Sequence, residues 1–306
     1  LAINGCVYTA DFADDAILGT ALSLAHLTGE ALFKALRAKI FRGLADHEMG
    51  HTVGLRHNFE GSTDALNYGK KYWEIRANVP PSEWAANSIG EHEYSTVMDY
   101  GARFNTDNEG LGRYDYAAIR FGYGQLIDIM PTAANAANGL AYDMFFGDYK
   151  TIPAMISGDK NAPATPTQID ETAVMRYSVA VTNLEQGYRD LVSNGGSFGI
   201  YPERPYRFCS DEFEGNLTCK RWDRGADQKE IVNNIIDLYK NYYVFNGYQR
   251  GRLNWSIDNY LLRLSNRYFN RFSEAFQFYY FFGDGFYGTY LSDDLLSAAV
   301  LSLNAL

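Results

Sequence analysis

The sequence predicts an α+β fold that is predominantly α-helical in this chain. Two stretches ahead of residue 47, Asp14–Leu27 and Glu30–Arg42, are rich in Ala, Leu, Ile and Lys with apolar residues at helical spacing. Strand signal is confined to Ala2–Ala10. Four later segments also have helical periodicity: Glu171–Val192, Gln228–Phe245, Ile257–Phe282 and Ser292–Leu303. We therefore expect many helices and few strands.

Three of the five histidines fall in one eleven-residue stretch with the pattern HExxHxxGxxH. Residues four apart project from one face of a helix, so His47 and His51 can bind the same ion. Glu48 follows the first ligand and lies beside the metal, where it can deprotonate a water as general base without occupying a coordination position. This spacing predicts one catalytic Zn²⁺ ion.

The end of this motif predicts a third zinc ligand. Gly54 comes three residues after His51, where glycine can adopt the left-handed conformation that ends a helix. The chain then reverses, which allows His57 to approach the same ion and leaves the fourth tetrahedral position open for water.

Residues 95–101 have the sequence Ser-x-x-Met-x-Tyr-Gly. A long zinc motif followed by such a methionine turn resembles the metzincin clan of zinc metallopeptidases. The resemblance implies that Met98 forms an apolar floor beneath the imidazoles, and that Tyr100 is a fifth ligand or a donor to the oxyanion. The alternative for Tyr100 is an ordinary buried tyrosine. Asp99 either anchors the turn or orients a ligand histidine.

A wider resemblance covers most of the chain. His47–Ser62, Met98–Tyr100, Tyr114–Gly124 and Phe208–Glu212 are similar to a family of large bacterial, presumed secreted zinc-dependent metalloproteases. In a metzincin the active-site helix follows a sheet of several strands, yet only 46 residues precede His47, and most of them have helical character. We expect a metzincin-like catalytic domain with most of its N-terminal sheet upstream or missing.

Local composition and periodicity divide the chain into three expected parts. Residues 1–130 hold the zinc motif and the methionine turn and form the expected metzincin-like core. Residues 131–168 are heavy in Ala, Asn, Gly, Pro and Thr and indicate a connecting region. Residues 169–306 are expected to form a mostly helical C-terminal subdomain.

Cysteine usage favours an oxidising compartment. Cys209 and Cys219 bracket a polar, acidic loop, and a disulfide that closes it would contribute about 2–3 kcal/mol. The alternative, a second zinc site, would lack ligands, because only two thiols and no histidine are nearby. Cys6 is left over as a buried thiol or as the partner of an upstream cysteine. We expect a secreted or periplasmic bacterial protein.

Composition restricts the partners. The net charge of −10 opposes nucleic-acid binding, and no apolar run approaches the roughly 20 residues that span a bilayer. We expect a protein or peptide substrate, with an upstream domain or propeptide of the same precursor as a further partner. The predicted function is that of a zinc metalloendopeptidase. The alternative is a zinc-stabilised, catalytically inactive binding or scaffold module.

Overall fold

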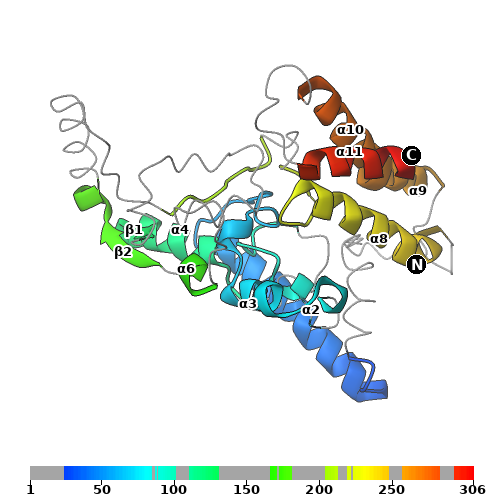
Figure 1. The fold of residues 1–306 in the computed structure, drawn as a ribbon. Helices are drawn as coiled ribbons and strands as arrows, with labels where there is room; N and C mark the ends of the chain where they lie inside the picture. The colour runs from blue at the N-terminus through cyan, green and yellow to red at the C-terminus, as the bar shows by residue number, and fades with distance from the viewer. Residues whose placement is uncertain are drawn as a thin grey trace.

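A computed structural model describes residues 24–84, 87, 89–100, 110–130, 166–170, 172–180, 204–212, 219–221, 223–247, 257–282 and 293–306. Within them the chain is mostly helical, with one small two-stranded sheet (Figure 1). The expected strand Ala2–Ala10, Cys6 and nearly all of the expected helix Asp14–Leu27 lie outside these residues. Only the last four residues predicted for that helix, Leu24–Leu27, are described. They form a turn, in which the Leu27 N–H donates to the Leu24 carbonyl at 2.8 Å.

The first described helix, α2, is Gly29–Thr52. It includes the predicted Glu30–Arg42 helix and continues through the first part of the zinc motif. Gly54 ends it with a φ of +90°, and the Leu55 N–H donates to the Gly50 carbonyl at 3.0 Å. This 6→1 hydrogen bond is the glycine-terminated helix end that the sequence predicts.

The chain after α2 packs around a core beside α3. Its elements are η1 (Ala65–Asn67), α3 (Lys70–Asn78), η2 (Pro81–Glu83), η3 (Ile89–His92), α4 (Arg113–Gly124) and α6 (Pro166–Asp170). Buried side chains from η1 and α3 join Met130, Ile169 and Ala226 in this core. Hydrophobic burial therefore ties segments that are far apart in sequence to one another.

The sheet pairs β1 (Leu126–Ile129) with β2 (Ala173–Arg176) in antiparallel register, Leu126 opposite Arg176 and Ile129 opposite Ala173. The expectation of a helix from Glu171 to Val192 is wrong at β2, because these residues pair with a strand more than 40 positions earlier. Such pairing overrides local helical preference. Helical conformation begins at Tyr177, and residues 181–192 lie outside the described part.

The C-terminal helices form a second packed group, drawn from yellow to red in Figure 1. It comprises α8 (Gln228–Gly247), α9 (Ile257–Leu264), a π-helical segment (Ser265–Phe269), α10 (Asn270–Phe282) and α11 (Asp293–Ala305). Val232, Tyr268, Phe272 and Ala298 lie in their shared core. The helices predicted at Gln228–Phe245, Ile257–Phe282 and Ser292–Leu303 are therefore confirmed in the described residues.

A buried arginine joins segments around the first core. Arg204 donates to the carbonyls of Leu66 at 2.7 Å and Ile169 at 3.0 Å, and to the side chain of Asn67 at 2.6 Å. Burial lowers the pKa of Arg204 to about 10, so the guanidinium stays charged at neutral pH. These hydrogen bonds fix the start of the 204–212 segment, which continues toward the histidine cluster. Among the helices described, none is both long and apolar enough to cross a bilayer.

Candidate metal centre

Three imidazoles converge at the end of α2. His47 and His51 lie one turn apart on the helix, and His57 follows the reversal at Gly54. One ring nitrogen from each of the three lies within 4.8 Å of the others. The Nε2 atoms of His51 and His57 are 3.2 Å apart. The structure therefore brings together all three histidines of the motif.

Each imidazole is held through its other nitrogen. The Nδ1 atom lies 2.6 Å from the Val97 carbonyl in His47 and 3.0 Å from the Leu55 carbonyl in His51. Since a carbonyl only accepts, Nδ1 is the donor in both rings. In a neutral imidazole Nε2 then carries a lone pair, and this is the atom left to bind a metal.

The third histidine has a carboxylate as its acceptor. His57 Nδ1 donates to Asp211 Oδ2 at 2.9 Å. This hydrogen bond is the largest cause of the lowered pKa of Asp211, and Arg221 also lowers that pKa. Asp211 is therefore ionised at neutral pH. Sequence reasoning did not identify Asp211 as a site residue, because no local spacing links residue 57 to residue 211.

The donor set fits one tetrahedral zinc ion. Two neutral imidazoles that both present lone pairs at 3.2 Å repel each other, and a cation between them removes the repulsion. Zn–N bonds of about 2.0–2.1 Å in tetrahedral geometry place two ligand nitrogens about 3.4 Å apart. Burial lowers the pKa of His47, and the charges of His51 and His57 also lower it, while the hydrogen bond to Val97 raises it. The lowered pKa favours the neutral form that metal binding requires.

Met98 lies directly against α2, the helix that carries His47 and His51. It is fully buried, and a Cβ atom built at Gly50 would be 2.3 Å from its Sδ. Leu55 packs against the same cluster. The Asn58 N–H donates to the Met98 carbonyl at 3.0 Å. The methionine side chain thus occupies the space beside Gly50, the residue before His51, where any larger side chain would have to lie.

The turn that carries Met98 is held from α4. Asp115, fully buried in the first turn of α4, accepts from the Val97 N–H at 3.0 Å, the Gly112 N–H at 2.7 Å and the Thr96 hydroxyl. Burial raises the pKa of Asp115, and these hydrogen bonds act in the opposite direction. The family resemblance noted in the sequence includes Tyr114–Gly124, but the sequence predicted neither a helix there nor a role for Asp115.

Asp99 anchors a neighbouring loop. Its Oδ2 accepts from both the backbone N–H and the hydroxyl of Ser62, each at 2.7 Å. Burial raises the pKa of Asp99 to about 7. Of the two roles left open for this residue, these contacts match the anchoring one. The acceptors that hold the three imidazoles are instead the Val97 and Leu55 carbonyls and the Asp211 carboxylate.

Tyr100 and Glu48 are both near the three imidazoles. The Tyr100 hydroxyl lies 3.0 Å from His57 Nε2, and its ring stacks against the ring of His47 with centroids 5.4 Å apart. Glu48 is exposed on α2 immediately after His47, and its negative charge raises the pKa of that histidine. The Tyr100 phenol therefore lies beside the imidazoles, and the Glu48 carboxylate is close enough to His47 to act on it electrostatically.

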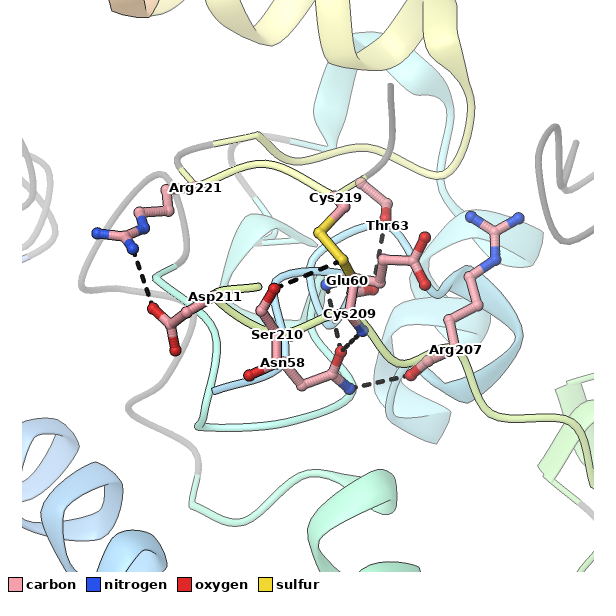
Figure 2. The surroundings of a disulfide bond; sticks show 9 residues. All are labelled: Asn58, Glu60, Thr63, Arg207, Cys209, Ser210, Asp211, Cys219 and Arg221. Carbon is pink, nitrogen blue, oxygen red and sulfur yellow. Dashed lines mark hydrogen bonds and ion pairs between the residues drawn. A yellow bond between two sulfur atoms is a disulfide. The ribbon is translucent and has the colours of Figure 1, made fainter. Parts of the chain in front are cut away.

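Cys209 and Cys219 form a disulfide in the structure (Figure 2). The segment around Cys209 pairs with the chain just after His57. The Phe59 N–H donates to the Cys209 carbonyl at 2.7 Å, and the Cys209 N–H donates to Asn58 Oδ1 at 3.0 Å. Both thiols are used in the bridge, which leaves none for the alternative of a second zinc site here.

Comparison with known proteins identifies a family similarity over the histidine motif. A family model described as "Met-zincin" matches residues 30–68, which include all of α2 except Gly29 and all three histidines. This part of the chain is thus similar to metzincins, and the similarity supports a zinc site formed by the histidines. The matched range ends before Met98 and Tyr100. No curated protein and no solved structure matches the chain.

Proposed function

We propose that this protein is a zinc-dependent metallopeptidase, and specifically an endopeptidase. The observation that carries the proposal is the convergence of three imidazoles whose Nδ1 atoms are all held by acceptors, so that their Nε2 atoms face one position. The similarity of residues 30–68 to metzincins supports the same assignment. His47, His51 and His57 are the proposed ligands of one Zn²⁺ ion.

A zinc ion in this position would act as a Lewis acid that lowers the pKa of a water molecule to about 7 and polarises the scissile carbonyl. Glu48 is the proposed general base. It takes the proton from the attacking water and then delivers that proton to the leaving amine as general acid. Its exposed position on the helix that carries two of the ligands suits a group that must meet both water and substrate.

Tyr100 is the proposed donor to the negative charge that develops on the scissile carbonyl oxygen. The hydroxyl that would make this hydrogen bond lies 3.0 Å from His57 Nε2, which is within reach of an atom bound beside the three imidazoles. Met98 is the proposed apolar floor under the ligand helix, since it packs against Gly50.

We also propose that the protein works outside the cytoplasm, as a secreted or periplasmic enzyme that acts on protein or peptide substrates. The Cys209–Cys219 disulfide supports this location, because structural disulfides form and persist in oxidising compartments.

The test compares wild-type protein with Glu48→Gln on casein and on quenched fluorescent peptides. We expect about one zinc per chain in both proteins, and a loss of kcat of about 10²–10⁴-fold in the variant, the usual contribution of a general base. Full activity in Glu48→Gln would refute the assigned base. A wild-type protein that binds zinc but cleaves no peptide would instead indicate a binding or scaffold module.

A further inference from the structure

The third ligand histidine differs from the other two in what holds it. His47 and His51 lie on α2, and their Nδ1 atoms contact backbone carbonyls. His57 lies beyond the helix end, and its Nδ1 contacts a side chain, the carboxylate of Asp211, from a segment 154 residues later. A ligand on a loop depends more on its hydrogen-bond partner for orientation than a ligand on a helix does.

We propose that Asp211 is the positioning residue for His57, and that Arg221 and the Cys209–Cys219 disulfide hold Asp211 in place. The inference rests on the proposed function, because it assumes that His57 binds the metal. It assigns roles to two side chains and a covalent bond that lie outside the zinc motif.

Asp211 is itself held on its second oxygen. Arg221 Nη2 donates to Asp211 Oδ1 at 3.1 Å, a contact drawn in Figure 2. With Oδ2 on His57 and Oδ1 on Arg221, the carboxylate has a fixed orientation. A carboxylate acceptor also makes the imidazole a stronger ligand than a carbonyl does, because it stabilises positive charge on the ring.

Arg221 connects this carboxylate to the aromatic surroundings of His57. Its guanidinium carbon lies 4.8 Å from the centre of the Phe59 ring and 5.4 Å from that of Tyr100. The same two rings flank the His57 ring, with centroids 5.4 and 4.9 Å away. Both arginine contacts are of the cation–π type. The arginine and the histidine thus share one pair of rings and one carboxylate.

The disulfide sets the relative position of the two charged residues. Cys209 precedes Asp211 by two residues, and Cys219 precedes Arg221 by two residues. The bridge therefore joins two short segments, 209–211 (the Cys209 arm) and 219–221 (the Cys219 arm), at their first residues. The Cys209 arm is attached to Phe59 through the backbone hydrogen bond described above.

The other arm is attached to α10. Lys220 forms an ion pair with Glu274 at 2.7 Å, and Arg271 donates to the Arg221 carbonyl. The Cys219 arm is therefore anchored to the C-terminal helices, and the disulfide connects that anchor to the segment that orients His57.

A neighbouring ion pair provides a matched control. Glu212, next to Asp211, pairs with Arg56, next to His57, and both side chains are more than half exposed. Replacement of Glu212 removes one negative charge from the same loop without touching a ligand. Exposed pairs of this kind contribute little to stability.

The experiment measures zinc affinity by competition with a chromophoric chelator for Asp211→Ala, Asp211→Asn and Glu212→Gln. We expect Asp211→Ala to weaken zinc binding by 10–100-fold, the usual effect of losing such an outer partner. Asp211→Asn, which keeps an oxygen that can accept from His57 Nδ1, should recover part of the loss, and Glu212→Gln should match wild type. The visible spectrum of the Co²⁺-substituted proteins should change only in the Asp211 variants.

A double-mutant comparison tests the disulfide. Cys209→Ser/Cys219→Ser should weaken zinc binding in the wild-type background and have a much smaller effect when Asp211 is already alanine. If the serine variant fails to fold, Arg221→Leu, which removes the guanidinium on Asp211, should give the same pattern. Equal losses in the two backgrounds would refute the linkage to Asp211.

The outcomes separate this inference from the proposed function. A wild-type protein that binds no zinc at the three histidines would refute both. A wild-type protein that binds zinc and an Asp211→Ala variant that binds it with the same affinity and the same Co²⁺ spectrum would refute only the positioning role.

Discussion

The packing of Met98 against Gly50 predicts the effect of a single methyl group. In Gly50→Ala the new Cβ would begin 2.3 Å from Met98 Sδ, whereas ordinary contacts between such atoms are about 3.5–4.0 Å. The sulfur must therefore move by about 1.2–1.7 Å. Since Met98 is fully buried, this movement disturbs its packed neighbours, and such overpacking costs about 1–3 kcal/mol.

A helix propensity term opposes that cost. Alanine is favoured over glycine inside a helix by about 0.5–1 kcal/mol, so the net change for Gly50→Ala runs from about zero to a loss of about 2.5 kcal/mol. Gly122 is the matched control, because it also lies in a helix but has no heavy atom within 4 Å of the position that an alanine Cβ would take. Gly122→Ala should gain the propensity term alone.

The assay is urea unfolding of both variants in the presence of a chelator, so that metal binding does not contribute. We expect the free energies of unfolding of the two variants to differ by the overpacking cost, about 1–3 kcal/mol. If Gly50→Ala stabilises the protein as much as Gly122→Ala does, the reasoning that places Met98 tightly under the ligand helix is refuted.

Four further predictions concern the candidate site and two buried charged positions outside it, the Arg224–Glu93 ion pair and Asp64. Tyr100→Phe should lower kcat on peptides about 10²–10³-fold while zinc stoichiometry stays unchanged, as expected when one donor to an oxyanion is lost. Removal of zinc by phenanthroline should abolish cleavage and, relative to protein at a free zinc concentration 100 times the Kd, reduce the free energy of unfolding by about 2.7 kcal/mol. Arg224→Met should cost about 3–5 kcal/mol in urea unfolding, because it leaves the equally buried Glu93 without the guanidinium 2.6 Å away, and Arg224→Met/Glu93→Gln should recover part of that loss. Burial raises the pKa of Asp64 to about 6, above its value in the unfolded chain. The stability that Asp64 contributes is therefore lost as pH rises from about 4 to about 6. Asp64→Asn should flatten this part of the curve of unfolding free energy against pH, measured without metal.

The parts of the site that the sequence predicted depend on short-range geometry. His47 and His51 are four residues apart on one helix, and Gly54 ends that helix at the expected position with a positive φ. Helical spacing and glycine conformation operate over a few residues, so they can be recognised without knowledge of the rest of the fold. The same reason accounts for the confirmed helices of the C-terminal part.

The parts that the sequence did not predict depend on contacts between distant segments. Ala173–Arg176 has no strong strand pattern and becomes a strand because β1 supplies its partner. Asp211 and Asp115 are two acidic residues among 37, and only the folded chain brings one to His57 and the other to the turn before Met98. The roles of such residues are set by tertiary packing, which local periodicity does not encode.

The distance in sequence between His57 and Asp211 also has a consequence for the order of events during synthesis. At about 5–20 residues per second, roughly 8–30 s separate the addition of these two residues to the growing chain. The three histidines are complete long before the carboxylate that holds the last of them exists. A nascent chain therefore carries the three imidazoles without the carboxylate that holds His57. On the proposed function, full zinc affinity would arise only after the C-terminal helices have anchored the 219–221 segment. High-affinity zinc binding at the proposed site would then be a late step in folding, and truncated chains that keep the histidine motif but lack Asp211 should bind zinc about 10–100-fold more weakly.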